Sequence, residues 1–397
     1  MRNLKSICIV EIDYHPEVLH NTCILLAEVP FEVTIFTTRL IFDQAQGSRF
    51  LKNFNWIIIE RVSEIKQTFQ RHLPEINSSD LILFNTLASH FKFFSKLEIK
   101  TISILRLHNS NAYLNPGKSF KTMFTPYFLF KDSSHIIRKT LFERDWYFRN
   151  KFLKRISYVV FPDPVLENYA VDNRLIDPSK VCPSIPISSW NPAYQKQNKT
   201  DEIRITIPGT IDIRRRDYRI VLNAFTMLSG RLNQNITLTL LGRPKNNYGK
   251  EIISEFRELQ NKQLKVITFT QKIPMDEYNS NLQQTDFFIL PIKIDTKYTI
   301  YRERYGYTKI SGSINDMIIA GKPALINADY PINSRLEQIS EKFYNEVDLH
   351  NTLINWVHEK TYLRLQEKIS ESLSFYSHEN MKKYVIDVFT NLINNFR

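Results

Sequence analysis

The sequence predicts an α/β protein with two parallel sheets in tandem, each covered by helices on both faces. Short apolar or alternating runs of strand length recur along the chain, separated by longer runs of helical periodicity. Between the two halves lies a stretch at 183–200 that is rich in Pro, Ser, Asn and Lys and has little periodicity, and the alternation resumes after it. A chain of 397 residues is also longer than one ordinary hydrophobic core can serve, so we expect two domains.

Each half of the chain shows the same order of elements. In the first half we expect strands at 6–11, 31–37, 56–60, 80–85, 101–107 and 158–161 and one beginning at 181, with helices at 18–28, 64–72, 87–97 and 131–155 and an irregular segment at 109–130. In the second half we expect strands at 203–207, 236–241, 264–269, 287–290 and 323–327, with helices at 218–228, 249–259, 276–283, 314–320, 349–360, 362–372 and 381–396. Such alternation is typical of parallel sheets. The expected domains are 1–190 and 200–378, followed by a separate helical segment at 379–397.

Composition limits the compartment and the class of partner. The formal net charge is +12, from 53 basic and 41 acidic residues, which favours anionic partners such as nucleotide-sugars, phospholipid surfaces or nucleic acid. Cys8, Cys23 and Cys182 lack zinc or redox spacing, which indicates reduced thiols in the cytosol. No apolar run approaches the roughly 20 residues of a membrane span. We therefore expect a cytoplasmic protein, with peripheral attachment to the inner face of the cell membrane as an alternative.

One stretch, residues 305–325, has the order of a phosphate-binding element. A polar, flexible loop leads through Ser311, Gly312 and Ser313 into an apolar-periodic helix, which stops at Gly321 before a strand. Free backbone N–H groups and the positive end of the helix dipole point at the same place, so the start of such a helix binds anions. The stretch therefore predicts a diphosphate site.

Other nucleotide and hydrolase motifs are missing. The nine glycines include no GxGxxG fingerprint, which excludes the usual dinucleotide site of an oxidoreductase. Gly312 and Gly321-Lys322 have the wrong spacing for a P-loop, and Ser311 to Ser313 lack the first glycine of a GxSxG nucleophile elbow.

Several motifs of the second half resemble a known enzyme family when taken in order. They are Ile-Pro-Gly-Thr at 207–210, Arg-Arg-Arg-Asp-Tyr at 214–218, Leu-Asn-Ala-Phe at 222–225, Leu-Gly-Arg at 241–243, Lys-Ile-Pro at 272–274 followed by Tyr278, Asp-Phe-Phe-Ile-Leu-Pro at 286–291 and Ala-Gly-Lys-Pro at 320–323. Over residues 200–330 this order resembles retaining GT-B glycosyltransferases of the bacterial group-1 type. The resemblance implies two Rossmann-like doubly wound domains with an interdomain cleft. It also implies an N-terminal acceptor domain, a C-terminal donor domain and a last helix that packs back on the first domain.

The resemblance and the predicted helix start together give a set of candidate donor-binding residues. They are Gly209, Thr210, Arg215 or Arg216, Lys309, Ser311, Gly312, Ser313 and Asp316. Fixed positive charge and backbone donors neutralise a leaving diphosphate, so we expect no cofactor and no metal, with the nucleotide-sugar as substrate. The family carries two acidic residues around this loop. The second falls on Asp316 and the first on Thr308, which is not acidic, although Glu303 is close in the sequence.

Polar residues follow two strands of the first half, where acceptor and base are expected. Asp13 and His15 come just after the first strand, and His108 and Asn109 follow the fifth. The carboxyl ends of strands line the ligand site of open α/β sheets. Asp13 or His15 therefore serves as the candidate base, and His108 and Asn109 lie on the acceptor side.

These observations lead to one main interpretation. We expect a hexosyltransferase that moves a sugar from a nucleotide-sugar to a glycan or lipid-linked acceptor in bacterial surface polysaccharide synthesis. The basic, aromatic segment 131–155 is either a partly buried helix or an interfacial helix that meets an anionic membrane surface. No nucleic-acid-binding motif is present, so nucleic acid is not an expected partner. The alternative is a non-catalytic GT-B-like binding or scaffolding protein, because the first acid of the family is replaced.

Overall fold

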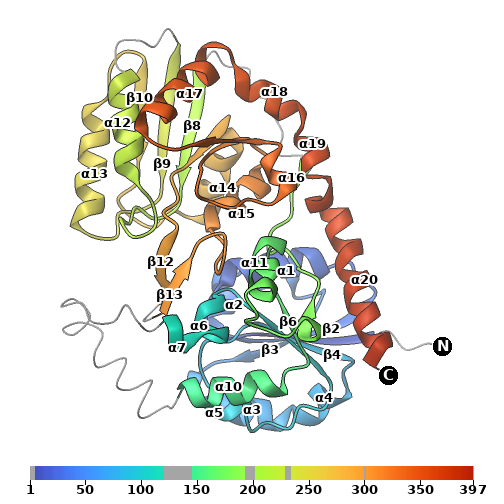
Figure 1. Cartoon of the computed structure of the whole chain (residues 1–397). Helices are drawn as coiled ribbons and strands as arrows, with labels where there is room; N and C mark the ends of the chain where they lie inside the picture. Colours follow the sequence, from blue (N-terminus) through green and yellow to red (C-terminus); the bar gives the residue numbers. More distant parts are fainter. Residues whose placement is uncertain (1–4, 120–144, 193–201, 229–233, 299–300, 397) are drawn as a thin grey trace. The chain divides into compact units, whose positions relative to one another are not determined.

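The computed structural model describes residues 5–119, 145–192, 202–228, 234–298 and 301–396, and Figure 1 traces them by sequence colour. The chain divides into two compact units. Unit 1 comprises Met1–Ile187, Tyr298–Glu303 and His378–Arg397, and unit 2 comprises Ser188–Lys297 and Arg304–Ser377. Each unit contains one parallel sheet, so the predicted fold class of two doubly wound α/β domains is confirmed.

The described part of unit 1 contains a seven-stranded parallel sheet in the order β3-β2-β1-β4-β5-β6-β7. Its strands are β1 (Lys5–Glu11), β2 (Phe31–Thr38), β3 (Asn55–Ile59), β4 (Leu81–Thr86), β5 (Ile102–Arg106), β6 (Tyr158–Val160) and β7 (Val181–Cys182). The central strands are buried along their length, as expected for a sheet with helices on both faces. The order reverses between β1 and β4, and ligands of open α/β sheets bind at the carboxyl ends of strands at such a switch point.

The helices in the described part of unit 1 are mostly short. They are α1 (Pro16–Leu26), α2 (Arg39–Gln44), α3 (Ile65–Arg71), α4 (Leu73–Ser78), α5 (Phe91–Phe94), α6 (Ser110–Leu114), α7 (Pro116–Ser119), α10 (Asp145–Arg155), α11 (Pro164–Asp172) and α20 (His378–Phe396), with 3-10 turns at Gly47–Phe50, Val62–Glu64 and Pro178–Lys180.

The described part of unit 2 repeats the arrangement with six parallel strands in the order β10-β9-β8-β11-β14-β15. They are β8 (Glu202–Pro208), β9 (Asn235–Leu241), β10 (Leu264–Thr268), β11 (Phe287–Leu290), β14 (Ala324–Asn327) and β15 (Ser340–Phe343). The helices are α12 (Tyr218–Leu228), α13 (Asn247–Glu258), α14 (Met275–Gln284), α15 (Gly312–Ala320), α16 (Ser334–Glu337), α17 (Glu346–His358), α18 (Thr361–Glu367) and α19 (Ile369–Ser372), with a 3-10 turn at Ser374–Tyr376. Here the order reverses between β8 and β11.

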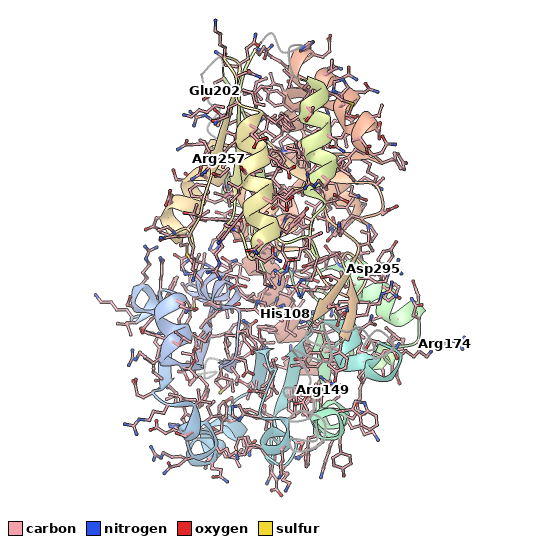
Figure 2. All side chains as sticks on the ribbon, turned by 90° about the vertical axis from the view of Figure 1, so that its left-hand side faces the viewer. His108, Arg149, Arg174, Glu202, Arg257 and Asp295 are labelled. Atoms are coloured by element: carbon pink, nitrogen blue, oxygen red, sulfur yellow. The ribbon has the colours of Figure 1, made fainter. Side chains whose placement is uncertain are left out.

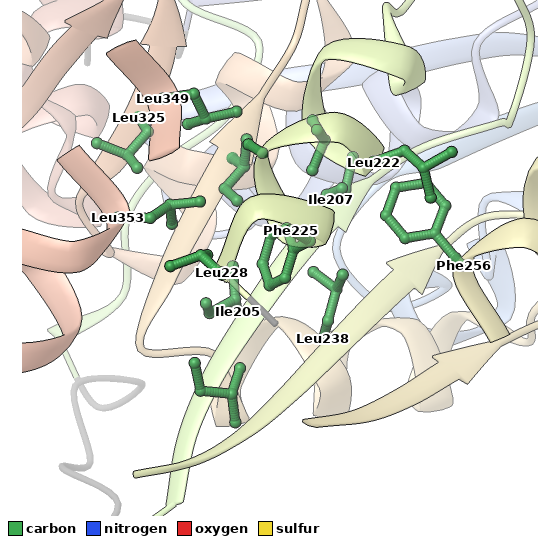
Figure 3. Packing of buried hydrophobic residues seen from close by; sticks show 14 of the residues in the cluster. Ile205, Ile207, Leu222, Phe225, Leu228, Leu238, Phe256, Leu325, Leu349 and Leu353 are labelled. Atoms are coloured by element: carbon green, nitrogen blue, oxygen red, sulfur yellow. The ribbon is translucent and has the colours of Figure 1, made fainter. Parts of the chain in front are cut away.

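The two faces of the unit 2 sheet bury different sets of side chains. In β11, Phe287 packs with Phe225 of α12 and Leu353 of α17 on one face, and Figure 3 shows part of this cluster. The next residue, Phe288, packs on the other face with Met317 of α15. This period-two alternation on a strand buried on both faces explains why its sequence is a continuous apolar run. The core therefore holds both β8 and α15 in place.

Two segments of unit 1 come from later parts of the chain. The first is Tyr298–Glu303, which contains most of β13 (Tyr301–Arg304) and the last residue of β12 (Asp295–Tyr298); in it, the Tyr301 hydroxyl accepts from Arg149 Nη2 at 2.9 Å. Arg149 is labelled in Figure 2. In α20, Tyr384 donates to the Ser184 carbonyl at 3.1 Å, and Lys382 pairs with Glu28 at 3.0 Å.

The structure corrects several predicted elements. The helix expected at 87–97 is only the single turn α5, and the segment expected to be irregular at 109–130 contains α6 and α7. The helix expected at 64–72 is α3, and a second helix, α4, follows it with Pro74 in its first turn, where the missing N–H costs nothing. Of the helix expected at 131–155, α10 covers Asp145–Arg155 and the remainder lies outside the described residues. Of the stretch at 183–200, Trp190 is buried in the core of unit 2, and residues 193–200 lie outside the described residues.

Among the described helices, none is long and apolar enough to cross a membrane.

Candidate functional site

Two glycines bring the ends of β8 and β9 into close contact in unit 2. Gly209 follows β8 with φ at 95°, and a Cβ there would collide with the Arg216 guanidinium. A Cβ on Gly242, after β9, would collide with the Gly209 carbonyl. Glycine is needed at 209 for the left-handed backbone and at 242 for the close approach of the two backbones. The predicted residue Gly209 therefore leaves space for Arg216 at the end of the sheet.

Arg216 is the most deeply placed of the predicted basic residues. It is 6% exposed, and its Nη1 donates to the Thr210 carbonyl at 3.1 Å while Nη2 donates to Ser313 Oγ at 2.6 Å. Ser313 in turn donates to the Pro208 carbonyl at 3.3 Å. Among the described residues, no acidic side chain pairs with Arg216, and its Nε has no hydrogen-bond partner. Buried charges are normally paired, so this guanidinium is electrostatically suited to an anion.

The first turn of α15 adds backbone donors beside Arg216. Ser311 is its N-cap residue, and the Ser311 side chain makes no capping hydrogen bond. A Cβ placed on Gly312 would meet nothing within 4 Å, so the space next to this N-terminus is open. The helix ends at Gly321, whose φ of 59° is a left-handed stop. An uncapped helix start beside a buried arginine is an arrangement that binds phosphate.

Asp316 lies in the same helix and is held by a tyrosine. Tyr278 of α14 donates its hydroxyl to Asp316 Oδ2 at 2.9 Å. Burial, together with the Asp316 carboxylate, raises the pKa of Tyr278 well above its usual value. Tyr278 thus stays protonated and orients the carboxylate. The sequence drew attention to Tyr278 as part of a motif but did not reveal this contact.

The loop before α15 is a tight turn rather than the flexible segment expected from the sequence. Thr308 is fully buried, and its hydroxyl accepts the N–H of Arg304 at 2.7 Å. The Arg304 carbonyl accepts from the backbone N–H groups of residues 307, 308 and 309. Thr308, where the family carries an acid, therefore closes this turn. The Lys309 ammonium lies 6.0 Å from the centroid of the Tyr305 ring.

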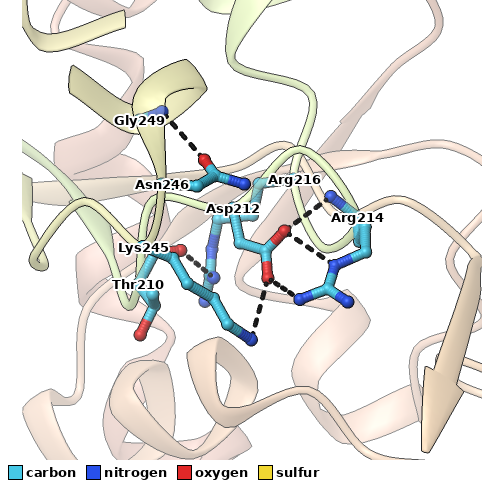
Figure 4. A network of polar contacts seen from close by, with 7 residues as sticks. All are labelled: Thr210, Asp212, Arg214, Arg216, Lys245, Asn246 and Gly249. Atoms are coloured by element: carbon cyan, nitrogen blue, oxygen red, sulfur yellow. Dashed lines mark hydrogen bonds and ion pairs between the residues drawn. The ribbon is translucent and has the colours of Figure 1, made fainter. Parts of the chain in front are cut away.

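The three arginines after Gly209 make different contacts, and Figure 4 shows those of Arg214 and Arg216. Arg214 pairs with the buried Asp212 at 2.9 Å, and Lys245 approaches the same carboxylate at 3.3 Å. Arg215 is exposed, and it contributes its backbone carbonyl to Lys293 N–H at 3.0 Å. Of the two arginines predicted for the donor, the structure brings only Arg216 to Ser313. The network around Asp212 was not predicted, although Asp-x-Arg after a strand end is a local signal for it.

In unit 1 two histidines from different strand ends stack on each other. The rings of His15 and His108 are 4.7 Å apart at their centroids with 24° between their planes. His15 caps α1 with φ at 66°, and its Nδ1 lies 2.8 Å from Glu17 Oε1. His108, labelled in Figure 2, is 8% exposed. The structure thus joins two of the predicted residues at the carboxyl edge of the sheet.

Asp13 and Asn109 are predicted site residues whose surroundings in the structure indicate a role in holding the fold. Asp13 accepts from the backbone N–H groups of Ala88 and Ser89 at 2.8 and 3.1 Å, and from the Ser89 hydroxyl. It therefore joins the loop after β1 to the loop after β4. Asn109 precedes α6, is 4% exposed, and its Oδ1 has no partner among the described residues. Of the two candidate bases, Asp13 is occupied by three hydrogen-bond donors, whereas the His15 side chain is 36% exposed.

No cluster of three or more His, Cys, Asp or Glu side chains that could hold a metal occurs in the part of the chain that is described. Positive charge at the unit 2 site comes instead from Arg216 and from the start of α15.

Comparison with known proteins relates this fold to solved structures over nearly the whole chain. HepE from Anabaena in complex with UDP aligns with a TM-score of 0.61 at 9% identity, covering 98% of this chain and 100% of that one. TarM aligns with a TM-score of 0.60 at 9% identity over 98% and 99%. A proposed UDP-N-acetylglucosamine 2-epimerase from Listeria monocytogenes aligns with a TM-score of 0.54 at 12% identity over 98% and 97%. The sequence matches no protein-family model and no curated protein.

These similarities define the class of fold: two Rossmann-like α/β domains of the GT-B type. At 9–12% identity the likeness concerns the fold alone, and a fold hosts more than one activity.

Proposed function

We propose that this protein is a glycosyltransferase that takes a sugar from a nucleotide-sugar bound by unit 2. The observation that carries the proposal is Arg216, a buried guanidinium with no acidic partner among the described residues, beside the open N-terminus of α15. An anion held there by Arg216 and the first backbone N–H groups of α15 would compensate both the buried charge and the helix dipole. A diphosphate has the charge and the oxygen acceptors for this task.

The chemistry follows from the leaving group. When the bond between the anomeric carbon and the diphosphate oxygen breaks, negative charge grows on that oxygen, and Arg216 and the α15 N-terminus stabilise it. The acceptor hydroxyl forms the new bond to the anomeric carbon and gives its proton to a base. We assign this role to His15, because an imidazole is the side chain that most often serves as a general base. His108 and Asn109 are proposed for the acceptor, and Asp316, oriented by Tyr278, for the donor. This assignment requires no metal or cofactor.

Similar folds support the choice of UDP as the first nucleotide to test. HepE was solved with UDP, with UDP and glucose, and with UDP-glucose. We therefore propose a UDP-linked hexose as donor and a glycan or lipid-linked acceptor of a bacterial surface polysaccharide.

Thermal shift with nucleotides tests the donor site. A ligand present at 100 times its Kd stabilises the folded state by about 2.7 kcal/mol, so UDP and UDP-glucose should raise the Tm. Arg216→Gln should abolish this rise, and Arg216→Lys should keep part of it, because the charge remains. Arg215→Gln is the matched control, since Arg215 is exposed, and should respond like the original protein. If no nucleotide raises the Tm, or if both Gln variants respond equally, the donor site is wrongly placed.

The second candidate is a nucleotide-sugar-binding protein without transferase activity. Thr308 favours it, because this buried hydroxyl closes a turn where the family has an acid that contacts the sugar. Both candidates predict the thermal shift. Release of UDP from UDP-glucose, followed with and without glycan acceptors, separates them: turnover that is lost in His15→Gln supports the transferase.

A membrane-linked acceptor is supported by the outer face of α10. Trp146 and Tyr147 are 53% and 56% exposed, and Lys151 and Lys154 are exposed on the same face. Aromatic and basic side chains together are suited to an anionic lipid surface. We expect co-sedimentation with anionic vesicles at low salt that weakens as salt rises.

The double variant Trp146→Ser, Tyr147→Ser should reduce vesicle binding several-fold. Tyr344→Ser is the control, because Tyr344 is 75% exposed but belongs to unit 2. Equal binding by the double variant and the control would remove α10 from the membrane proposal.

A further inference from the structure

Glu11 is a carboxyl group enclosed in the middle of the unit 1 sheet. It ends β1 at the switch point of the sheet and has no exposed surface. A buried carboxylate without a cation is costly, so either it is paired or it is neutral. Neither the sequence motifs nor the proposed reaction assigns a role to it.

A local irregularity places two polar residues opposite Glu11. The register between β1 and β4 shifts between Val10 and Glu11, so that Val10 lies opposite Phe84 and Glu11 lies opposite Thr86. Asn85 is therefore an additional residue on β4. Such bulges re-aim side chains next to functional sites. Here the bulge brings both Asn85 and Thr86 to one carboxyl group.

The hydrogen bonds around Glu11 lead to the histidine pair. Asn85 Nδ2 donates to Glu11 Oε2 at 3.2 Å, and Thr86, which lies opposite Glu11 on β4, is close enough to lower the pKa of the carboxyl group. His108 Nε2 lies 3.0 Å from the Asn85 carbonyl and 3.2 Å from Thr86 Oγ1. A carbonyl oxygen only accepts, so Nε2 of His108 carries the hydrogen in the neutral ring, which is the Nε2–H tautomer.

The charges that face Glu11 favour its neutral form. Burial raises the pKa of Glu11 well above its usual value, the Thr86 hydrogen bond lowers it, and the carboxylates of Asp13 and Glu17 raise it further. Arg106 acts in the opposite direction from β5. Burial lowers the pKa of Arg106 to about 10, and its Nη1 donates to the Ile185 carbonyl at 2.9 Å. No hydrogen bond or ion pair joins Arg106 to Glu11 among the described residues, and Oε1 of Glu11 has no partner there.

We propose that Glu11 is a positioning residue. As a protonated acid it holds Asn85 and Thr86 in place, and these two residues keep His108 in its Nε2–H tautomer next to the His15 ring. A neutral acid fixes the hydrogen bonds beneath the histidine pair without placing a buried negative charge there. The link to catalysis rests on the proposed function, whereas the tautomer and the state of Glu11 are properties of the protein alone.

Nitrogen-15 NMR of the histidine rings tests the proposal without any substrate. The signals of His108 are assigned with His108→Gln. In the original protein and in Glu11→Gln, a neutral variant of the same shape, we expect the Nε2–H tautomer of His108. In Glu11→Ala and in Thr86→Val, which removes the hydroxyl between the two groups, we expect a mixture of tautomers. Near-UV circular dichroism establishes that each variant is folded.

Two results would overturn the proposal. If Glu11→Gln unfolds or loses the tautomer, Glu11 acts as an ion that Arg106 balances. If all folded variants keep the tautomer, Glu11 does not position His108. Should Glu11→Ala not fold, Glu11→Gln and Thr86→Val carry the test.

Kinetics then connect the network to the reaction. For sugar transfer, we expect Thr86→Val and Glu11→Ala to lower kcat by about tenfold with the KM for the donor unchanged, and Glu11→Gln to restore most of the rate. If the tautomer responds as expected but the original protein transfers no sugar to any acceptor, the proposed function fails and the positioning role stands.

Discussion

At the scale of single residues, environment rather than residue type decides what each charged side chain does. Arg214, Arg215 and Arg216 are consecutive and chemically identical. One pairs with Asp212, one is exposed, and one is buried against Ser313. A change to one of them therefore predicts nothing about the other two.

Asp212 provides a prediction on pH at this scale. Burial raises its pKa, but hydrogen bonds and charge from Arg214 outweigh this effect and, with Lys245, lower the pKa to about 2. An unfolded aspartate has a pKa of about 3.9. Because the folded pKa is the lower one, the stabilisation is complete above about pH 4 to 5 and is lost as the pH falls through about 2.

We therefore expect the Tm difference between the original protein and Asp212→Asn to be constant near neutral pH and to shrink between about pH 4 and pH 2. Asp217→Asn controls for the loss of a carboxylate from the same loop. A Tm difference that is as large at pH 2.5 as at pH 7 would contradict this role of Asp212.

At the scale of elements, a short connecting segment can supply a side chain that stabilises a distant helix. The hairpin β12–β13 delivers Glu303 to the start of α6, where its carboxylate accepts the N–H of Ala112 at 2.8 Å and of Asn111 at 3.3 Å. Glu303 is fully buried and belongs to unit 1, where its carboxylate bonds the start of α6. Because α6 begins directly after Asn109, this contact also holds the end of β5 in place.

Glu303→Ala should lower the free energy of unfolding by about 1–3 kcal/mol, because it leaves N–H groups of α6 without their acceptor. Glu303→Gln retains an acceptor oxygen and should lose less. Urea unfolding measures both, with Arg302→Gln, an exposed neighbour, as control. Equal stability of all three variants would show that Glu303 does not anchor α6.

At the scale of the whole molecule, the order of the chain and the composition of its compact units differ. α20 follows unit 2 in the sequence but belongs to unit 1, with Val385 and Phe389 on its buried face. The ring of Phe389 lies 6.5 Å from that of Phe31 in β2. Unit 1 is therefore complete only when the last residues of the chain are in place.

Phe389→Ala should destabilise unit 1 by about 3–5 kcal/mol, the usual cost of removing a buried phenylalanine. We expect faster hydrogen exchange in β1, β2 and β5 with little change in β8 and β9. Phe225→Ala, a buried phenylalanine of unit 2, is the matched control and should give the opposite pattern. Uniformly faster exchange in both units after either change would mean that the units do not unfold separately.

Much of the fold could be predicted because the spacing of apolar residues within short segments indicates which segments are strands and which are helices. The apolar runs of β1, β4, β8 and β11 are buried on both faces, and such runs appear in the sequence regardless of context. The helix predicted at 87–97 failed because Phe91 and Phe94 are buried by packing with other aromatic rings, not by a long amphipathic helix. The hairpin β12–β13 and β15 were missed because their sequences are short and polar, and pairing alone makes them strands.

The sequence by itself determined the class of fold, the end of α15 at Gly321 and the set of residues at strand ends, because strand periodicity, helix stops and parallel order are local properties. It also placed Arg216, Ser313, His15 and His108 among the candidates. Only the tertiary structure decided which of them meet. It buried Arg216 against Ser313, stacked His15 on His108, closed a turn with Thr308 and enclosed Glu11 behind a bulge. These contacts join residues far apart in the chain, and their strength depends on burial and desolvation, which no single segment carries.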